Sequence, residues 1–355
     1  MKTNLIAFIF IFLPFYFLES VITNAQPNFI KSTWDWVMPK KIETEQRAFI
    51  QFAEECGFNT VIVKPTDAII DEAHNRKMLA FDILYPGVSN EFAKKHPDCL
   101  QKMLPFEESI NKIMEAIPYK NFNGYIQMAH REFNIFYSGD YPCFEHEECI
   151  QELCREIKEK FDANPIDGIA LDFFGFKNLY ACFCEKCQVL RKEIKAKNPT
   201  RTDDEIIATF SEESLIKVSQ RLYDYVKSIK PNAIVTCHIY PVFNPNPYYG
   251  NRFRVDYCGQ TIAWFFKPFW TLDEVALKAK RFKSLEDTKY NKFMPFVACF
   301  GQQETLYLKK SPEQLRREFL IAREYGGGNV MFATLGVLNE HRDLFEAVKG
   351  VLKQW

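Results

Sequence analysis

The stretch Pro165–Phe176 reads PIDGIALDFFGF, and the rest of the chain is best interpreted around it. Residues Gly168–Leu171 are small or apolar, as in a strand that is covered on both faces. The run ends on a carboxylate, Asp172. In a parallel β/α protein the C-terminal ends of the strands carry the chemistry. The position therefore predicts a functional role for Asp172. The alternative is a carboxylate that caps the next loop or pairs with a base such as Lys64.

The N-terminus has the pattern of a secretory signal peptide. Lys2 precedes an apolar segment, Leu5–Leu18, which is followed by the small-residue exit Thr23–Ala25. This pattern predicts a signal peptide over residues 1–25 and a secreted or periplasmic mature protein. A membrane anchor is the alternative, but a proline and a glutamate interrupt a segment that is already short for a span. No later segment reaches about 18 uninterrupted apolar residues, so no membrane span is expected after cleavage.

The composition narrows the expected partners. The 45 Lys and Arg residues nearly balance the 46 Asp and Glu residues, and the formal net charge is -1. Without a basic run, nucleic acid is not an expected partner. Aromatic residues make up 15% of the chain, with 34 Phe and 16 Tyr. Most of them must belong to a core, but aromatic faces also stack on sugar rings, so the composition permits an oligosaccharide or polysaccharide ligand.

Strand-like apolar runs alternate with helical patterns along residues 26–355. The predicted strands lie at about 29–34, 60–64, 78–84, 165–172, 233–238, 257–264, 293–299 and 329–333. The predicted helices lie at about 43–56, 145–161, 212–230, 272–285, 312–326 and 341–353. Eight strands in a chain of this length predict an α/β fold, a single (β/α)8 TIM barrel. A doubly wound sheet is the competitor, but no glycine-rich turn follows the first strand.

The segment of residues 86–143, after the third strand, is too long for an ordinary connection, and we expect it to cap the site. Polar and aromatic residues at the strand ends are the candidates for the site itself. At the strand ends these are Trp34, Asp35, Trp36, Lys64, Asp82, Tyr85, Asp172, His238, Tyr240, Trp264, Gln302, Gln303, Glu304 and Thr334. The loop after the fourth strand adds Lys177 and Asn178, and the insertion adds His130, Arg131 and Glu132.

A helix, the motif DGIALDFFGF and a Cys-x-Cys-x-x-Cys loop follow one another, and this pattern resembles secreted glycoside-hydrolase-like (β/α)8 barrels. The arrangement is similar over about residues 28–350, and the specific motif is confined to about residues 165–190. The resemblance implies carbohydrate degradation by hydrolysis of glycosidic bonds. In the α-galactosidase and amylase types the Asp that closes strand four is the nucleophile, which implies that role for Asp172.

The second carboxyl group that a glycosidase needs is less evident. Relatives often carry the general acid after strand five or six, where this chain offers His238, Tyr240 and Trp264. Glu304 is the first choice for the partner of Asp172 because it follows strand seven directly. The other candidates are Glu132, Asp82 and Asp35.

The same residues suit a lyase or dehydratase that eliminates at a uronic acid. Elimination needs a base for the C5 proton, an acid for the leaving oxygen and a cation for the carboxylate. His238 or Tyr240 would serve as base or acid, and His130 is a further candidate. Lys64, Arg131 and Lys177 are the candidates for binding the carboxylate. A non-catalytic sugar-binding barrel is the third interpretation, because a fold does not determine its function.

An aromatic platform for sugar rings is expected on the same face. Its candidate members are Trp34, Trp36, Trp264, Phe266 and Trp270. Adjacent residues of a strand point to opposite sides, so we expect Trp34 or Trp36, but not both, to contact a ligand. The alternative is that alternate members pack into the barrel and support its loops.

The chain has 11 cysteines, an odd number that leaves at least one unpaired within a monomer. Four of them fall on apolar helix or strand positions and are expected to be buried thiols. These are Cys56, Cys237, Cys258 and Cys299. No Cys/His pairing suggests a catalytic thiol.

The cysteine-rich loop after the fourth strand has two competing interpretations. The close spacing of Cys182, Cys184 and Cys187 suits a structural zinc site with a fourth ligand from elsewhere. The candidates for that ligand are Cys143, Cys149 and Cys154. In an exported chain disulfides compete strongly, and a disulfide-braced loop is the favoured alternative. Apart from this zinc, no cofactor is expected.

Overall fold

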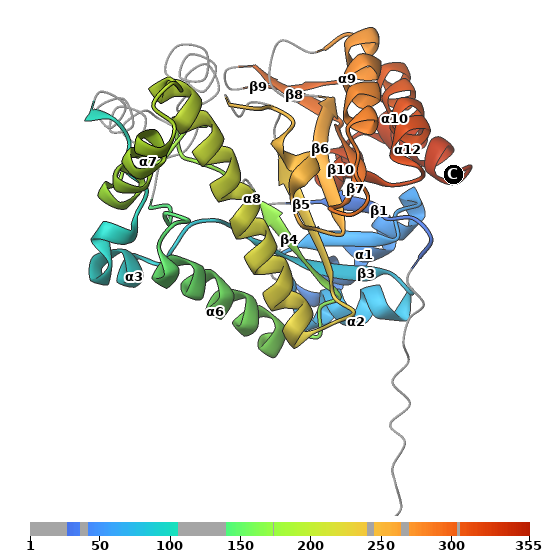
Figure 1. Cartoon of the computed structure of the whole chain (residues 1–355). Coiled ribbons are helices and arrows are strands. Elements are labelled where there is room, and N and C mark those ends of the chain that lie inside the picture. Colours follow the sequence, from blue (N-terminus) through green and yellow to red (C-terminus); the bar gives the residue numbers. More distant parts are fainter. Residues whose placement is uncertain are drawn as a thin grey trace, which may run out of the picture.

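A computed structural model describes residues 27–35, 42–105, 140–172, 174–239, 245–263, 270–303 and 306–355. Its centre is a closed barrel of eight parallel strands in the order β1-β10-β7-β6-β5-β4-β3-β2 (Figure 1). The barrel strands are β1 (Lys31–Trp34), β2 (Thr60–Val63), β3 (Leu79–Leu84), β4 (Gly168–Asp172), β5 (Ile234–Ile239), β6 (Tyr257–Ala263), β7 (Lys292–Ala298) and β10 (Val330–Ala333). The predicted (β/α)8 barrel is confirmed, and the predicted strand positions agree with these bounds.

Helices alternate with these strands, and most of them cover the outside of the barrel. They are α1 (Glu43–Cys56), α2 (Asp67–Asn75), α3 (Asn90–Lys95), α6 (Glu147–Ala163), α7 (Glu185–Lys197), α8 (Asp203–Ile229), α9 (Leu272–Ser284), α10 (Pro312–Gly326), α11 (Leu335–Glu340) and α12 (Arg342–Leu352). Two 3-10 turns, η1 (Pro97–Cys99) and η4 (Tyr249–Arg252), and a hairpin of β8 (Phe300–Gln303) with β9 (Leu306–Lys309) complete the described elements.

Local sequence signals explain where several helices begin and end. Helix α1 ends at Gly57, which adopts the left-handed conformation with φ of 100°. At the start of α10 the Ser311 hydroxyl accepts a hydrogen bond from the backbone N–H of Gln314, with proline at the first helical position. Both boundaries agree with the sequence prediction.

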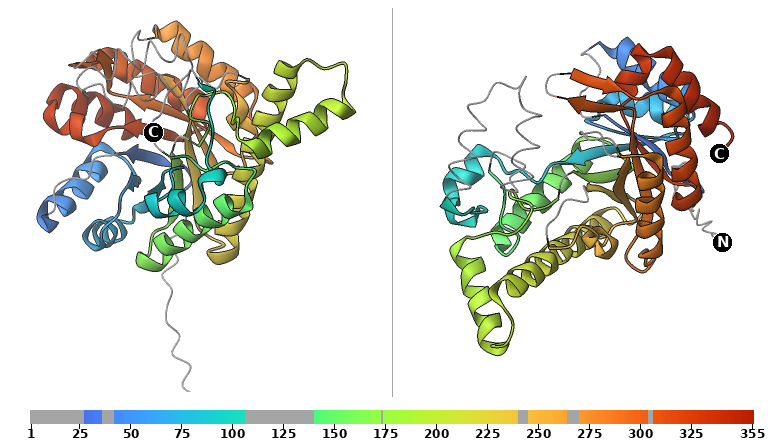
Figure 2. Two further views of the ribbon diagram at one scale, coloured as in Figure 1. Left: turned by 90° about the vertical axis from the view of Figure 1, so that its left-hand side faces the viewer. Right: turned by 90° about the horizontal axis from the view of Figure 1, so that it is seen from above.

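Helix α8 is longer than predicted, because it begins at Asp203 and not near residue 212. Its start is a capping box. The Thr202 hydroxyl accepts from the Glu205 backbone N–H at 3.2 Å, and the Glu205 carboxylate accepts from the Thr202 N–H at 2.8 Å. The Thr-x-x-Glu pattern was the sequence signal that the prediction missed. Helix α7 and the first part of α8 form an arm that projects away from the barrel, while the rest of α8 packs at the barrel beside α6 (Figure 2).

The barrel interior is filled by side chains from strands on opposite sides. The ring of His238 on β5 lies with its centroid 5.4 Å from that of Trp34 on β1 and 4.1 Å from that of Phe296 on β7. Lower in the barrel, Gly168 on β4 leaves room for Phe81 on β3, whose Cδ1 would lie 2.9 Å from a Cβ at position 168. Since strand side chains alternate, Asp172 shares the inward face of β4 with Gly168.

In the parts of the chain that the structure describes, we find no helix with the length and apolar character that a membrane crossing requires.

Candidate functional site

Asp172 and His238 form a buried pair at the carboxyl end of the barrel. They are directly paired residues of the neighbouring strands β4 and β5. The distance from His238 Nδ1 to Asp172 Oδ1 is 3.4 Å, and both side chains are 0% exposed. The Asp172 carboxylate needs a close polar partner there, because burial of an isolated carboxylate is costly. Asp172 and one of the sequence candidates for an acid or base therefore lie in contact.

The surroundings of His238 favour its neutral form. Burial lowers the pKa of His238, and the hydrogen bond and charge of Asp172 oppose that effect. Its other ring nitrogen, Nε2, lies 3.3 Å from the Thr261 hydroxyl on β6. A neutral imidazole that donates from Nδ1 to the carboxylate can accept from this hydroxyl. The arrangement orients the ring and supplies a group that can exchange a proton beside Asp172.

The negative charge of Asp172 contributes to the raised pKa values of two tyrosines. Burial raises the pKa of Tyr85 to about 12, with a smaller contribution from the Asp172 charge. The pKa of Tyr141 is also raised, first by burial and then by Asp172. Tyr85 follows β3, as a strand-end candidate, whereas Tyr141 comes from the far end of the insertion and was missed by sequence reasoning. Its position two residues before Cys143 was the available signal.

Two of the proposed partner acids have contacts on the outside of the barrel. Asp82 points toward α6, where its Oδ2 lies 3.1 Å from Lys160 Nζ. Asp35 accepts a hydrogen bond from the Leu335 backbone N–H at 2.9 Å and one from the Thr33 hydroxyl at 2.7 Å. It thereby caps α11, whose own N-cap residue makes no side-chain cap. These contacts give both aspartates structural roles, and we do not assign either of them as the partner of Asp172.

The remaining described candidates differ in their surroundings. Trp34 is 0% exposed and packs against His238 inside the barrel. Lys64 is exposed at the end of β2. Asn178 is fully buried, and its Oδ1 accepts from the backbone N–H groups of Tyr180 and Ala181 at 3.1 and 3.0 Å. Asn178 thus shapes the loop after β4.

Gln101 is a second residue that sequence reasoning missed, and it ties three segments together. Its Nε2 donates to the backbone oxygens of Pro142 and Gly175, at 3.0 and 3.3 Å, and its Oε1 accepts from the Lys177 N–H at 3.0 Å. The side chain is 7% exposed. The start and end of the insertion are therefore joined to the loop after Asp172.

Several candidate residues lie outside the part of the chain that is described. These are Trp36, His130, Arg131, Glu132, Tyr240, Trp264, Phe266 and Glu304. Gln302 lies on β8, where its backbone pairs with Tyr307. Most of the insertion, residues 106–139, is also outside the described ranges, so its capping role stays a prediction.

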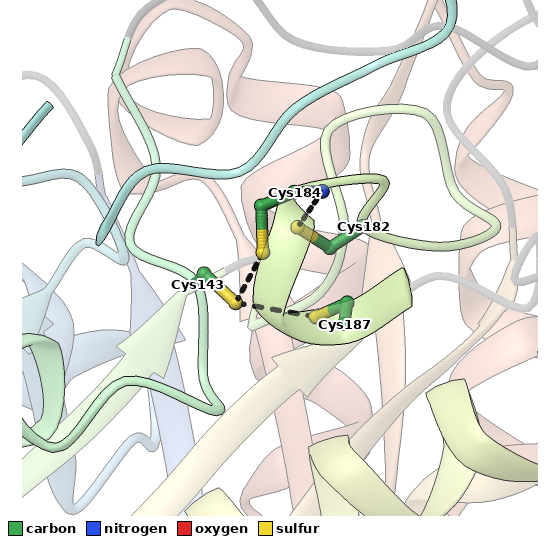
Figure 3. A group of neighbouring side chains, drawn as sticks. All are labelled: Cys143, Cys182, Cys184 and Cys187. Atoms are coloured by element: carbon green, nitrogen blue, oxygen red, sulfur yellow. Dashed lines mark hydrogen bonds between the residues drawn. The ribbon is translucent and has the colours of Figure 1, made fainter. Parts of the chain in front are cut away.

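The loop after β4 also builds a cluster of four thiols. Cys182, Cys184 and Cys187 meet Cys143 with all four sulfur atoms within 4.8 Å of one another (Figure 3). All 11 cysteines of the chain are free thiols in the structure, and the favoured disulfide-braced loop is not what it contains. The sulfurs gather around one point as a group of four. Cys56, Cys237, Cys258 and Cys299 are buried, as predicted.

A surface hollow of about 460 Å³ lies at the other, amino-terminal end of the barrel. It is lined by residues that precede or begin β5, β6 and β7, among them Asn232, Asp256 and Lys292. Asp256 is paired there with Lys227 on α8 at 2.9 Å. This hollow is remote from Asp172 by its position on the strands and is not part of the candidate site.

No protein-family model matches the chain, and no curated protein matches its sequence. Among solved structures, the chain is similar to a β-galactosidase from Bacillus circulans sp. alkalophilus, with 15% identity and a TM-score of 0.62 over 92% of this chain and 56% of that one. It is also similar to α-L-fucosidase isoenzyme 2 from Paenibacillus thiaminolyticus, with 16% identity and a TM-score of 0.55 over 92% of this chain and 49% of that one.

A third similar structure is the PgaB (BpsB) glycoside hydrolase domain from Bordetella bronchiseptica, with 12% identity and a TM-score of 0.57 over 91% of this chain and 98% of that one. The chain therefore spans about half the length of the β-galactosidase and the fucosidase, and nearly all of this domain. At such identities the similarity is one of fold: the chain has a TIM barrel of the kind found in glycoside hydrolases.

Proposed function

We propose that the protein is a carbohydrate-active hydrolase that cleaves glycosidic bonds, with Asp172 as its nucleophile. The observation that carries the proposal is the contact of Asp172 with His238 on the inward face of the barrel, at the carboxyl ends of β4 and β5. In TIM barrels this end of the strands holds the reacting groups. The fold similarity to glycoside hydrolases supports the substrate class.

The proposed reaction has two steps. A carboxylate oxygen of Asp172 forms a bond to the anomeric carbon, while the bond from that carbon to the leaving oxygen breaks and a general acid protonates that oxygen. Water then gives its proton to the same group and displaces Asp172, so that the configuration is retained. His238 would orient the carboxylate by donating a hydrogen bond from Nδ1.

Glu304 is the proposed general acid. It follows β8 directly in the sequence, six residues after the seventh barrel strand, β7, ends at Ala298. The engagement of Asp82 with Lys160 and of Asp35 with the start of α11 leaves Glu304 and Glu132 as the partner candidates from the sequence. A Glu304→Gln variant tests the assignment, because rescue by an activated substrate whose leaving group needs no proton is expected of a general-acid variant.

Replacing the nucleophile is the direct test. We expect Asp172→Asn to lower kcat by at least about 100-fold on a neutral or acidic oligosaccharide, since the amide cannot form the covalent intermediate. The thermal unfolding curve should stay close to that of the wild type. Asp224→Asn, an exposed carboxylate on the barrel's outer helix α8, is the matched control and should keep full activity. Undiminished turnover in the Asp172 variant would reject the proposal.

Elimination at a uronic acid is the second candidate, favoured by one observation. A neutral imidazole in contact with a carboxylate, as His238 is with Asp172, is suited to proton abstraction. Hydrolysis releases a reducing end without a new double bond, whereas elimination also creates an unsaturated uronate that absorbs in the ultraviolet. Ultraviolet absorbance that develops with acidic oligosaccharides would replace the hydrolase proposal by a lyase. Thermal stabilisation by sugars without either product would indicate a binding protein.

We also propose that the protein acts outside the cytoplasm, because residues 1–25 have the pattern of a signal peptide. Expression with this segment is expected to export a protein whose N-terminus is Gln26. N-terminal sequencing of the exported protein tests the cleavage, and a protein retained with Met1 intact would contradict it.

A further inference from the structure

The four thiols of the cluster have the spacing of ligands around one metal ion. The Cys143 sulfur lies 3.4 Å from that of Cys187 and 3.6 Å from that of Cys184. Four sulfurs at a Zn–S distance of about 2.3 Å in a tetrahedron are about 3.8 Å apart. A disulfide would instead require an S–S distance of about 2.05 Å. The cluster therefore fits a single tetrahedral ion closely, and it needs only small shifts to bind one.

The burial of the cluster argues in the same direction. The four side chains are at most 2% exposed. Four converging thiols gain little from packing against each other, whereas a soft, tetrahedral set of sulfur ligands is the environment that zinc prefers. A closed set of four protein ligands leaves no open position for substrate, so it has the form of a structural site.

Groups around the cluster can stabilise the negative charge of thiolates. Cys184 is the N-cap of α7, and Cys187 lies in the first turn of that helix. The positive end of a helix dipole favours thiolates there. The Cys184 backbone N–H donates to the Cys182 sulfur at 3.4 Å. The Arg191 guanidinium, which is buried, donates to the Cys182 carbonyl at 2.7 Å and brings a positive charge to the loop.

We propose that Cys143, Cys182, Cys184 and Cys187 bind one zinc ion. The ion replaces the four thiol protons, which are released to solvent. It joins the end of the insertion, at Cys143, to the loop that follows Asp172 and to the start of α7. The neighbouring contacts support this role: Phe144 stacks on Phe174 at 5.1 Å, and the Phe183 N–H donates to the Lys102 carbonyl. The zinc ion thus holds the loop after β4 in place.

A second set of residues near the cluster is the main alternative location for a metal. Cys99, His146 and Glu148 can bring their ligand atoms within 4.8 Å of one another. This set has three members, one of them exposed, and His146 Nε2 also lies 3.9 Å from the Cys184 sulfur. It lacks the fourth ligand of a closed structural site, so we place the zinc in the tetrathiolate cluster.

The first experiment measures the metal in the full chain, expressed and purified without chelators. Inductively coupled plasma mass spectrometry should find one zinc per chain. Growth with cobalt should give the intense thiolate-to-cobalt charge-transfer absorption of a tetrahedral sulfur site. Less than about one fifth of a metal ion per chain, together with no cobalt absorption, overturns the proposal. A disulfide between any two cluster cysteines, found by mass spectrometry of the alkylated chain, also overturns it. These measurements do not depend on any enzymatic activity.

Variants locate the ion. Cys182→Ser and Cys184→Ser should lose zinc, while Cys154→Ser, a half-buried thiol on α6 outside the cluster, should retain it. His146→Ala should also retain zinc. If this variant lost its zinc while the cluster variants kept theirs, the assignment would be overturned. Because cluster variants can misfold, the folded wild-type chain is also titrated with a thiol-modifying mercurial and a zinc-binding dye. One zinc per chain should be released, and only as thiols are modified; zinc released before any thiol reacts would contradict thiolate ligation.

Discussion

Asp35 directly follows β1, Asp172 closes β4, and Asp82 lies within the second half of β3. The side to which each of these aspartates points determines its contacts. Asp172 points inward and contacts His238, whereas Asp82 points outward to Lys160 on α6. Asp35 points outward and caps α11. The residue type is the same in all three, but only Asp172 faces the barrel interior beside His238. This is the reason why we propose Asp172, and not Asp35 or Asp82, as the nucleophile.

Asp35 is expected to make the stability of the protein depend on pH. Burial raises the pKa of Asp35 to about 7 from its ordinary value of 3.8, against opposing hydrogen bonds from Thr33, Leu335 and Gly336. Because the folded state binds this proton more tightly than the unfolded state, the contribution of Asp35 is greatest below pH 3.8 and is lost as the pH rises toward about 7. Above that value it no longer changes.

The variant Asp35→Asn should remove this dependence while it keeps the cap, since an amide oxygen can still accept from the Leu335 N–H. Urea unfolding at several values between about pH 4 and pH 8 measures the free energy of unfolding of the wild type and of the variant, and the difference between the two is followed with pH. Asp35→Ala is the comparison for loss of the cap, at a cost of about 1 kcal/mol. A wild-type minus Asp35→Asn difference that is constant over the whole range would contradict the raised pKa.

At the scale of elements, local signals predicted most strands and helices correctly. The left-handed stop at Gly57 and the Ser311 cap are readable because they depend on a few consecutive residues. The start of α8 at the Thr202 capping box is equally local, although the sequence prediction placed it near residue 212. The contacts of Gln101 could not be predicted, because they join residues 101, 142, 175 and 177 and depend on how the insertion returns to the barrel.

The close packing of β4 gives a test at this scale. A Cβ at Gly168 would lie 2.3 Å from the Ile234 backbone oxygen and 2.9 Å from Phe81 Cδ1, so Gly168→Ala should destabilise the fold by about 1–3 kcal/mol. The matched control is Gly350→Ala in α12, where nothing lies within 4 Å, and it should stabilise the protein by about 0.5–1 kcal/mol. Urea unfolding compares the two. Equal changes in the free energy of unfolding would show that the contacts around Gly168 can accommodate a methyl group.

In the whole molecule, the barrel differs from the arm of α7 and the first part of α8 in how many side chains it buries. The buried residues of α7 are Cys187 and Arg191, both in its first half. Those of α10 are spread along its length and include Leu315, Phe319 and Ala322. Helix α10 packs on β7 and β10, whereas α7 packs on α8 (Figure 2).

Hydrogen exchange should separate these two parts. Amides of residues 192–205, around the end of α7 and the start of α8, should exchange through local opening, because few buried contacts hold them. Amides of α10 should exchange only at the rate of global unfolding. Digestion of the quenched chain, followed by mass spectrometry of the peptides, measures both segments in one sample. Equal protection of the two segments would mean that the arm is stabilised by a partner surface.

The order of strands and helices, the barrel, and the position of Asp172 at the end of a buried strand could be predicted from the sequence alone. These features follow from periodicity and capping, which act over a few neighbouring residues. The contact of His238 with Asp172, the orientation of Asp35 and Asp82 away from it, and the meeting of Cys143 with Cys182, Cys184 and Cys187 came from the tertiary structure alone. Each of these depends on how strands pair and how loops and helices pack on them, which brings together residues 39–300 positions apart in the sequence.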